Sequence, residues 1–429
     1  MNEHVRAGQS LPRLVAPGTR RNIAVLTEDV LSAVAEAVAD LGTASKADLV
    51  RHMGLPRSTV SAHVDWLLNR SVLVHVEGEK RIARGRPAEA VALNGRAGWV
   101  LAVEMGALKT TAAVVDLAGE VLARRQVDLP VAQDPDSYLG ALTDLLHELT
   151  GEAALTAGHA VPPANWVAAM ALPARIDTET RTPLRPTIMP TWDGYPVGAA
   201  VEERLGCPAL LENDCSVRAL GEAGFLGPEH LPLISVQIGT GVGAGIVDSS
   251  GHIIRGANGA AGDVGHIPYS RGGDALCSCG SRGCVEAVAS VPAMLAKIEA
   301  AGVTCSDPTL RGSDLLLRLL REGDPAVTQA IDESAEAIGE VVASLCNVIN
   351  PRRVMITSAL ANVGHELLAG VRSSVYSRAR PLATKDLVID YSRLGADVGI
   401  AGGYLMGREH LLQPGTIKAL RVTGPDGDA

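Results

Sequence analysis

A histidine and three cysteines in the second half of the chain constrain its local structure more than any other feature. His266 is followed by Cys277, Cys279 and Cys284, and the cysteines lie within the run CSCGSRGCVE. One imidazole and three thiolates complete a tetrahedral zinc site and leave no open position for chemistry. The alternative is a turn that holds reduced cysteines, although three thiols among Gly, Ser and Arg suit neither a core nor a disulfide framework. The pattern therefore favours a structural zinc ion that fixes the shape of a loop.

That loop has a carboxylate at each end, Asp263 before the histidine and Glu286 after the last cysteine. A metal that only fixes a loop also fixes the side chains that the loop carries. Asp263 and Glu286 are therefore candidate ligand-binding residues, with the zinc ion as their scaffold.

Length and composition indicate an ordinary globular protein of two or three domains. The chain has 429 residues, of which 47% are hydrophobic. Its first residues include several charges and no continuous apolar run, so neither secretion nor membrane insertion is predicted. We expect a cytoplasmic protein with no membrane partner.

The N-terminal part differs in charge from the remainder. Residues 1–96 hold 13 Lys and Arg against 10 Asp and Glu, and the rest holds 25 against 38, so the formal charges are +3 and −13. An acidic body repels a polyanion, whereas a small basic head can approach one. This asymmetry is typical of a DNA-binding module attached to another domain.

Three short helices are predicted in the head. Apolar residues recur at helical spacing over 26–41, and Gly42 ends this helix. Ser45 is expected to cap a second helix, KADLVRHM, which stops at Gly54, and a third begins after Pro56. This order indicates a helix-turn-helix, whose third helix would present four residues to a major groove: Arg57, Ser58, Thr59 and Ser61.

The segment VLVHVEGEKRIARGRPAEAVALN follows and predicts two strands joined by a turn, which together form a β-wing. Its basic residues, Lys80, Arg81, Arg84 and Arg86, could neutralise phosphates, and the last two could reach a minor groove. The alternative is that the helices and the hairpin form a protein-interaction module.

The body that follows is predicted to be α/β, with strands over 98–105, 109–117 and 120–129 joined by glycine turns. The first strand ends near Glu104, and Gly106 and Lys109 come next. A carboxylate, a glycine turn and a cation in this order meet a phosphate or a metal-bound nucleotide in some folds.

A second glycine turn lies in the run LISVQIGTGVGAGIV. Backbone N–H groups there could cradle an anion, namely those of Gly239, Thr240, Gly241 and Gly243. A glycine hairpin without a ligand is the alternative.

Asn213 and Asp214 follow an apolar strand and are expected to cap a helix that starts near Cys215. A carboxylate at the C-terminal end of a strand faces the usual ligand crevice of an α/β domain. Asp214 could therefore accept a proton from a sugar hydroxyl or hydrogen-bond it. A helix cap without any ligand is an equal alternative.

Four segments carry a family resemblance. In order and spacing, the chain is similar to the ROK family of sugar kinases and sugar-responsive repressors over about residues 97–410, through ENDCSVRALGE, QIGTGVGAGIV, GANGAAGDVGHIPY and CSCGSRGCVEAVAS. The resemblance implies an actin-like, hexokinase-type pair of α/β lobes with a sugar between them and zinc at the cysteine–histidine set. Members with an N-terminal winged helix are transcription factors, and the RGRP run is similar to their linker.

The resulting domain plan has four parts. A flexible tail is expected at 1–23, a winged helix-turn-helix at 24–95, a ROK body at 96–412 and a C-terminal tail at 413–429. Lobe one would cover 97–212 together with a helix at 396–412, and lobe two would cover 213–395.

The resemblance also implies which residues contact the sugar: Asn213, Asp214, Asp263, His266 and Glu286. His266 would serve both the zinc ion and the pocket. Kinase members have Glu where this chain has Asp263, whose side chain is shorter by one methylene. We expect its contacts with the sugar to survive with a changed reach of the carboxylate.

The nucleotide half departs from the kinase pattern. Kinase members have Asp, Gly, Thr and Lys where this chain has Glu104, Gly106, Leu108 and Lys109. Leu108 therefore replaces the threonine, and its hydroxyl is lost. A kinase glycine pair near the nucleotide is replaced within 358–360, where side chains would intrude on the adenosine site. We therefore expect ATP and Mg²⁺ not to bind, the phosphate-binding residues to be vestigial and Asp214 to be a vestigial general base.

We accordingly expect a sugar-responsive regulator, a repressor, that binds double-stranded operator DNA and a sugar or phosphosugar. It would associate with the nucleoid when bound to DNA. Residues 326–350 predict a long amphipathic helix with an apolar stripe running from Ala330 to Val348, and the resemblance implies a homodimer or a dimer of dimers through this region. Two rival functions are a ROK sugar kinase with an appended DNA-binding head and a protein-binding module that takes no sugar.

Overall fold

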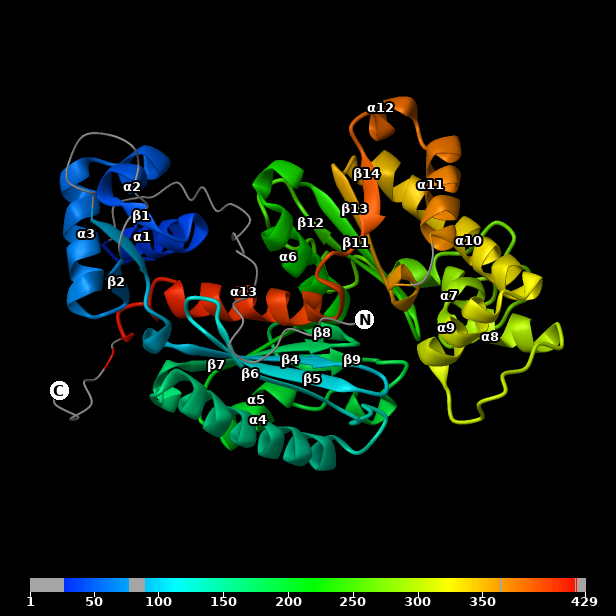
Figure 1. Cartoon of the computed structure of the whole chain (residues 1–429), viewed down its shortest axis with the longest axis horizontal. Helices are drawn as coiled ribbons and strands as arrows, with labels where there is room; N and C mark the ends of the chain where they lie inside the picture. Colours follow the sequence, from blue (N-terminus) through cyan, green and yellow to red (C-terminus); the bar gives the residue numbers. More distant parts are fainter. Residues whose placement is uncertain (1–26, 77–88, 363–364, 421, 423–429) are drawn as a thin grey trace. The chain divides into compact units, whose positions relative to one another are not determined.

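The computed structural model describes residues 27–76, 89–362, 365–420 and 422 (Figure 1). The expected N-terminal tail lies outside these residues. They group into two compact units, Met1–Val217 with Gly399–Ala429, and Arg218–Val398. Among the described helices, none is both long enough and apolar enough to cross a membrane.

The head begins the first unit and contains the three predicted helices. Its elements are α1 (Thr27–Leu41), α2 (Lys46–Met53), α3 (Arg57–Asn69), β1 (Ala44–Ser45), β2 (Leu73–Val76) and β3 (Ala90–Leu93). The Ser45 hydroxyl accepts from the backbone N–H of Asp48, whose carboxylate accepts from the backbone N–H of Ser45, which is a complete capping box. Gly54, at a φ of 66°, ends α2. The predicted helix boundaries are confirmed, and those of α2 are set by a local cap at each end.

The small sheet of the head has the order β1-β3-β2, with antiparallel pairs. Its core side chains come from all three helices and include Leu31, Leu49 and Leu67, each 1% exposed or less. The predicted wing turn, with Lys80, Arg81, Arg84 and Arg86, lies outside the described residues.

The rest of the first unit is built on a five-stranded sheet of order β10-β7-β4-β5-β6. Its elements are β4 (Trp99–Met105), β5 (Thr110–Asp116), β6 (Val121–Val127), β7 (Trp166–Leu172), β8 (Arg175–Asp177), β9 (Thr182–Leu184), β10 (Ala209–Asn213), α4 (Pro135–Ala157), α5 (Val197–Leu205) and α13 (Val398–Leu412). Strands β4, β5 and β6 form the predicted antiparallel meander, and β4 pairs in parallel with β7.

Helices α4 and α13 lie against opposite faces of this sheet (Figure 1). Because side chains alternate along a strand, Leu101 and Val103 of β4 join the same core as the apolar side chains of α4. On the other face, a methyl group at Gly407 of α13 would lie 2.5 Å from the Val100 side chain. The helix therefore needs glycine where it crosses β4.

The second unit has a four-stranded sheet of order β12-β11-β13-β14. Its elements are α6 (Asp214–Leu226, whose first turn belongs to the first unit), β11 (Leu233–Ile238), β12 (Val242–Val247), α7 (Val285–Ala289), α8 (Val291–Ala300), α9 (Gly312–Glu322), α10 (Pro325–Ile349), β13 (Arg353–Ser358), α11 (Glu366–Arg378), α12 (Pro381–Thr384) and β14 (Val388–Tyr391).

The predicted long helix is α10, and one position of its predicted apolar stripe is wrong. Ala330, Ile331 and Ile338 are buried in the core of the unit, but Val348 is 79% exposed. Cys346 of the same turn is fully buried, and Val348, two positions later, lies on the opposite side of the helix and faces solvent.

Candidate functional site

The cysteine–histidine set comes together in the second unit. His266 ends a short 3-10 helix (Val264–His266), and the three cysteines lie on the loop before α7. The ligand atoms of His266, Cys277, Cys279 and Cys284 all lie within 4.8 Å of one another. His266 thus shares one small volume with three cysteines that follow it by 11 to 18 positions.

Two separations match those of a tetrahedral zinc site. Metal–sulfur and metal–nitrogen bonds of about 2.3 and 2.0–2.1 Å place two sulfurs about 3.8 Å apart, and a sulfur and a nitrogen about 3.6 Å apart. The Cys279 and Cys284 sulfurs are 3.9 Å apart, and the Cys277 sulfur is 3.5 Å from Nδ1 of His266. These two separations fit a zinc ion, and four such ligands would complete its tetrahedral coordination.

The thiols differ in their surroundings. A backbone N–H of Ser281 lowers the pKa of Cys279 to about 7, whereas burial raises the pKa of Cys284 to about 12. Burial also raises the pKa of Cys277. A divalent cation among these sulfurs would supply the positive charge that burial of thiolates requires.

The other ring nitrogen of His266 faces Asp263. Nε2 lies 3.7 Å from Oδ1 of Asp263, and both side chains are partly exposed. A carboxylate on the second nitrogen orients a ligating imidazole. Asp263 can thus orient the His266 imidazole while part of its carboxylate stays accessible.

Glu286 connects the cysteine loop with the glycine turn. Its Oε1 accepts from the Ser278 hydroxyl at 2.8 Å, and its Oε2 accepts from the backbone N–H of Val242 at 3.1 Å. The side chain is partly exposed on the first turn of α7. Asp263, His266 and Glu286, three of the predicted sugar-binding residues, are therefore in one unit and are held by the same loop.

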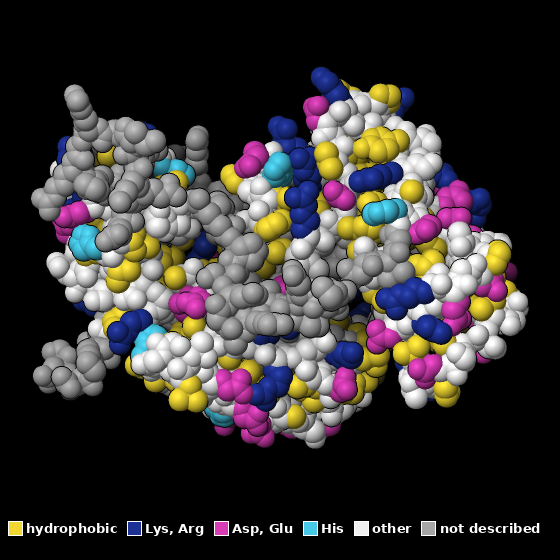
Figure 2. All heavy atoms as spheres, in the orientation of Figure 1, with side chains coloured by type: hydrophobic (Ala, Val, Ile, Leu, Met, Phe, Trp, Pro, Cys, Tyr) yellow, Lys and Arg dark blue, Asp and Glu magenta, His cyan; other side chains and the backbone are white. Residues whose placement is uncertain are grey.

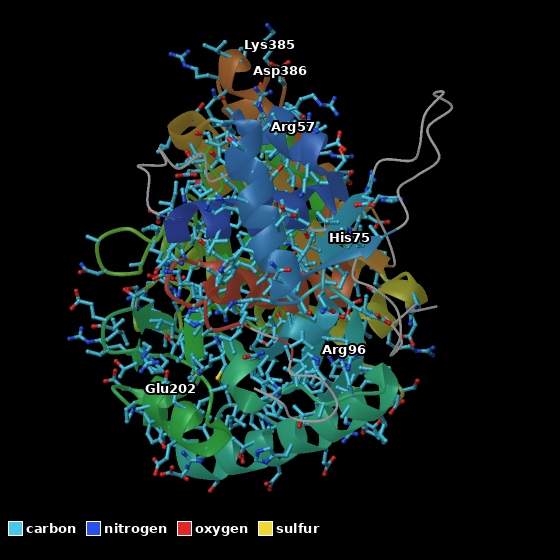
Figure 3. All side chains as sticks on the ribbon, turned by 90° about the vertical axis from the view of Figure 1, so that its left-hand side faces the viewer. Arg57, His75, Arg96, Glu202, Lys385 and Asp386 are labelled. Carbon is cyan, nitrogen blue, oxygen red and sulfur yellow. The ribbon has the colours of Figure 1, made fainter. Side chains whose placement is uncertain are left out.

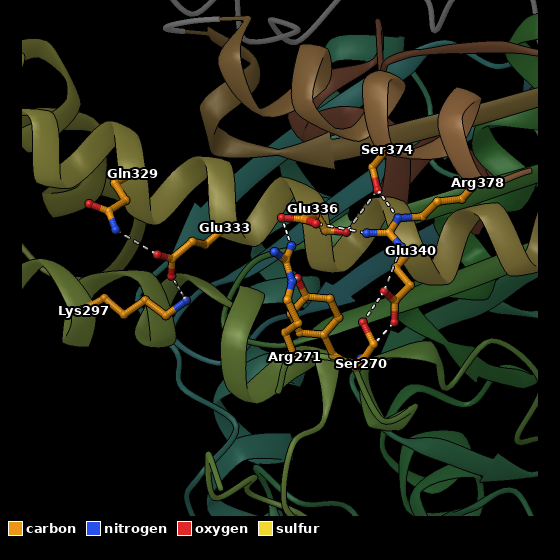
Figure 4. A network of polar contacts seen from close by, with 10 residues as sticks. Ser270, Arg271, Lys297, Gln329, Glu333, Glu336, Glu340, Ser374 and Arg378 are labelled. Carbon is orange, nitrogen blue, oxygen red and sulfur yellow. Dashed lines mark hydrogen bonds and ion pairs between the residues drawn. The ribbon is translucent and has the colours of Figure 1, made fainter. Parts of the chain in front are cut away.

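The segment that follows His266 is also attached to α10 (Figure 4). Glu340 accepts from the Ser270 backbone N–H at 2.9 Å and from its hydroxyl at 2.6 Å. Arg271 forms an ion pair with Glu336, which also pairs with Arg378 of α11. The loop is thus fixed to the helices on one side and carries the cysteines on the other.

Asn213 and Asp214 lie in the first unit, at the junction of β10 and α6. The Asn213 side-chain oxygen accepts from the N–H groups of Cys215 and Ser216, at 3.0 and 3.2 Å. Its amide donates to the carbonyl oxygen of Ala174 at 3.1 Å. The predicted helix cap is confirmed, and the cap holds the Asp214 carboxylate at the N-terminus of α6.

The nucleotide-side residues of the first unit also lie where β4 ends. Glu104 is 7% exposed, and a methyl group at Gly399 would meet its carboxyl carbon at 2.4 Å. The carboxylate therefore lies against the first turn of α13. Gly106 donates its N–H to the carbonyl oxygen of Lys109 at 2.9 Å, which makes the turn tight, and the Lys109 side chain is exposed.

The second glycine turn is shorter than the sequence suggested. Gly239, Thr240 and Gly241 form the turn, whereas Gly243 lies within β12 opposite Gln237. The Gly239 N–H donates to the carbonyl oxygen of Gly241 at 2.9 Å. One of the N–H groups that we expected to bind an anion is thus already hydrogen-bonded within the turn.

We expected the side chains of the segment after β13 to block a nucleotide, and the structure agrees with this at only some of the positions. Leu360 is 3% exposed and belongs to the hydrophobic core, so it points away from any ligand space. Ser358 and Ala359 remain partly exposed. The steric argument is therefore limited to these two smaller side chains.

The predicted DNA-facing residues of the head are at the start of α3. Arg57 and Ser58 are exposed, and Thr59 and Ser61 are partly exposed. Figure 3 looks onto the head and shows Arg57 at the outer end of α3. The buried face of α3 is formed by Val60, Val64 and Leu67, as the helical period requires.

Sequence reasoning missed three polar residues that support the site: Ser270, Ser278 and Glu340. Each acts through a partner more than five positions away. The position of Ser278 between Cys277 and Cys279 was the only local signal.

Comparison with known proteins places these features in a family. The model of the ROK family matches residues 100–409. A xylose repressor of Caldicellulosiruptor bescii is 27% identical over 84% of this chain and 90% of its own length. A glucokinase of Halalkalibacterium halodurans is 31% identical over 49% of this chain and 67% of its own length.

The solved structure of a ROK family transcriptional regulator, a homologue of the E. coli Mlc protein, matches with a TM-score of 0.75. It is 24% identical to this chain, and the match covers 92% of this chain and 98% of that one. The fold is thus the actin-like, hexokinase-type α/β fold preceded by an N-terminal helical region. With about three quarters of its length matched by the family model, the chain belongs to the ROK family.

Proposed function

We propose that this protein is a sugar-responsive transcriptional repressor. The observation that carries the proposal is that one chain joins a helix-turn-helix to a ROK body. A match to 84% of the chain cannot be confined to residues 100–429, so the similarity to the xylose repressor extends into the head. The glucokinase match covers only 49% of the chain.

The effector in this proposal is a sugar or a phosphosugar. Carboxylates and an imidazole accept and donate hydrogen bonds to hydroxyl groups, and Asp263, His266 and Glu286 present these groups on one braced loop. Asn213 and Asp214 are the other two residues that we propose to contact the sugar. Zinc would hold the loop and take no part in any reaction.

The DNA contact would come from α3, with Arg57 at its start, and from the basic wing residues. Acidic and basic side chains are interspersed over the face shown in Figure 2, so a local cluster has to supply the attraction to phosphates. A homodimer would match a palindromic operator. Since its partner would be chromosomal DNA, the protein would act in the cytoplasm, on the nucleoid.

A ROK sugar kinase with an appended head is the second candidate. Asp214 at the N-terminus of α6 and the similarity to a glucokinase favour it. Against it, Glu104 lies against α13, Leu108 is 60% exposed where kinases have a threonine, and the Val242 N–H already binds Glu286. These features leave a nucleotide phosphate and its metal with weak contacts.

The decisive experiment measures DNA binding and sugar binding on the full chain. A DNA duplex is first selected from a random library, and its affinity is then measured with each sugar and sugar phosphate of a panel. We expect at least one of them to change the affinity about five- to 150-fold. Arg57→Ala should weaken DNA binding and leave the sugar affinity unchanged.

Two results would overturn the proposal. One is sugar-dependent ADP release from ATP at ordinary kinase rates of about 1–100 per second without any DNA binding. The other is DNA binding that no member of the panel changes, together with calorimetry that detects no sugar binding.

A further inference from the structure

Glu286 is held from two sides, and each side is a different loop of the second unit. The Ser278 hydroxyl, located between the zinc-ligand positions Cys277 and Cys279, donates to Oε1 at 2.8 Å. The backbone N–H of Val242, directly after the glycine turn, donates to Oε2 at 3.1 Å. A carboxylate with both oxygens bonded has a fixed orientation.

The glycine turn is shaped around this carboxylate. A methyl group on Gly241 would lie 2.6 Å from Oε2 of Glu286, whereas one on Gly239 would meet nothing within 4 Å. The Gly239 N–H is bonded to the Gly241 carbonyl oxygen. Two N–H groups at the turn thus have protein partners, and an anion bound there would face the Glu286 carboxylate.

We propose that Ser278 and the Gly241–Val242 backbone are positioning residues for Glu286, so that the glycine turn serves sugar recognition in this chain and no longer holds a phosphate. This inference rests on the proposed function and assigns new roles within the same site. It also links sugar binding to the cysteine loop, through the short hydrogen bond of Ser278 and a longer contact of the Cys277 sulfur, 3.8 Å from the same Glu286 oxygen.

The first test uses Ser278→Ala and Ser278→Thr. Loss of a hydrogen bond to a charged group should weaken the affinity for the sugar found in the panel about ten-fold in Ser278→Ala. Ser278→Thr keeps the hydroxyl and should restore most of the affinity. The zinc content of both variants should equal that of the wild type, which separates the loss of positioning from a loss of metal.

The second test compares Gly241→Ala with Gly239→Ala in the same turn. Gly241→Ala should weaken sugar binding about ten- to 100-fold, because the methyl group displaces the carboxylate. Gly239→Ala should cause a loss at least about five times smaller, since its methyl group meets open space. Gly241→Ala should also lower the thermal midpoint of the otherwise wild-type protein. In a Glu286→Ala background it should not, because the added methyl group clashes with the Glu286 side chain alone.

The outcomes separate this inference from the proposed function. If the wild type binds sugar, Glu286→Gln abolishes that binding, and Ser278→Ala and Gly241→Ala both bind as the wild type does, the positioning roles are refuted while the function stands. If phosphate or an ATP analogue protects Gly241 N–H and Val242 N–H from exchange, the turn is a phosphate site and the inference is also refuted. A wild type that binds no sugar refutes the proposed function itself.

Discussion

Replacement of Glu222 by Gln should stabilise the protein at alkaline pH. Glu222 lies on α6 with 0% of its surface exposed, and both of its carboxylate oxygens are enclosed. Burial raises the pKa of Glu222 from 4.5 to about 7, and Ser392 and Arg218 offset only part of this rise. A folded-state pKa above the unfolded value means that the folded protein holds the proton more tightly.

The sign and the size follow from that difference. Well below pH 4.5 the carboxyl is protonated in both the folded and the unfolded state, so its ionisation does not change the free energy of unfolding. Between about pH 4.5 and 7 only the unfolded state ionises, so the free energy of unfolding falls, and the total loss reaches about 3 kcal/mol at about 1.4 kcal/mol per pKa unit. Gln has nearly the same shape and no charge, so the variant should escape this loss.

Thermal unfolding of both proteins at pH 5, 6, 7 and 8 measures the effect. The midpoints should differ by only about 2–3 °C at pH 5, and Glu222→Gln should unfold up to about 6–12 °C higher at pH 8, at about 2–4 °C per kcal/mol for a unit of this size. Glu299→Gln, at an exposed position of α8, is the matched control and should change the midpoint by less than about 2 °C at every pH. A difference between wild type and Glu222→Gln that stays constant from pH 5 to pH 8 would refute the reasoning.

Two further predictions concern the metal and the attachment of the head. The purified protein should contain about one zinc per chain, and Cys284→Ser should lower both the zinc content, measured by elemental analysis, and the thermal midpoint; a zinc content unchanged by this substitution would contradict the ligand assignment. Arg408 of α13, whose side chain is 4% exposed, lies 3.5 Å from Asp40 of α1, so Asp40→Asn should cost about 1–3 kcal/mol in denaturant unfolding. The exposed pair of Asp65 with Lys46 provides the control, and Asp65→Asn should cost less than about 1 kcal/mol; equal effects of the two substitutions would show that the Arg408 pair adds nothing.

Local signals located the helices and strands well where the caps are encoded within a few residues. Ser45 and Gly54 bound α2 as predicted, because a capping box and a left-handed glycine depend on neighbours in the sequence. The candidate metal-binding set was also visible, since its donor atoms are chemically distinctive and closely spaced.

Positions that depend on distant packing could not be predicted in the same way. Val348 was counted in the apolar stripe of α10 but is exposed, because it lies on the side of the last turn opposite the buried Cys346. Leu360 was expected near a nucleotide and instead joins the core, since the direction of a side chain after a strand is set by the 3-10 turn that follows.

The sequence by itself determined the three helices of the head, the α/β body and the chemistry of the cysteine–histidine loop, because these depend on hydrogen bonds and residue types within short segments. Only the tertiary structure decided what Glu286 does, since its two partners, Ser278 and Val242, come from separate loops. A carboxylate takes its role from the donors that surround it, and those donors meet only when the chain has folded.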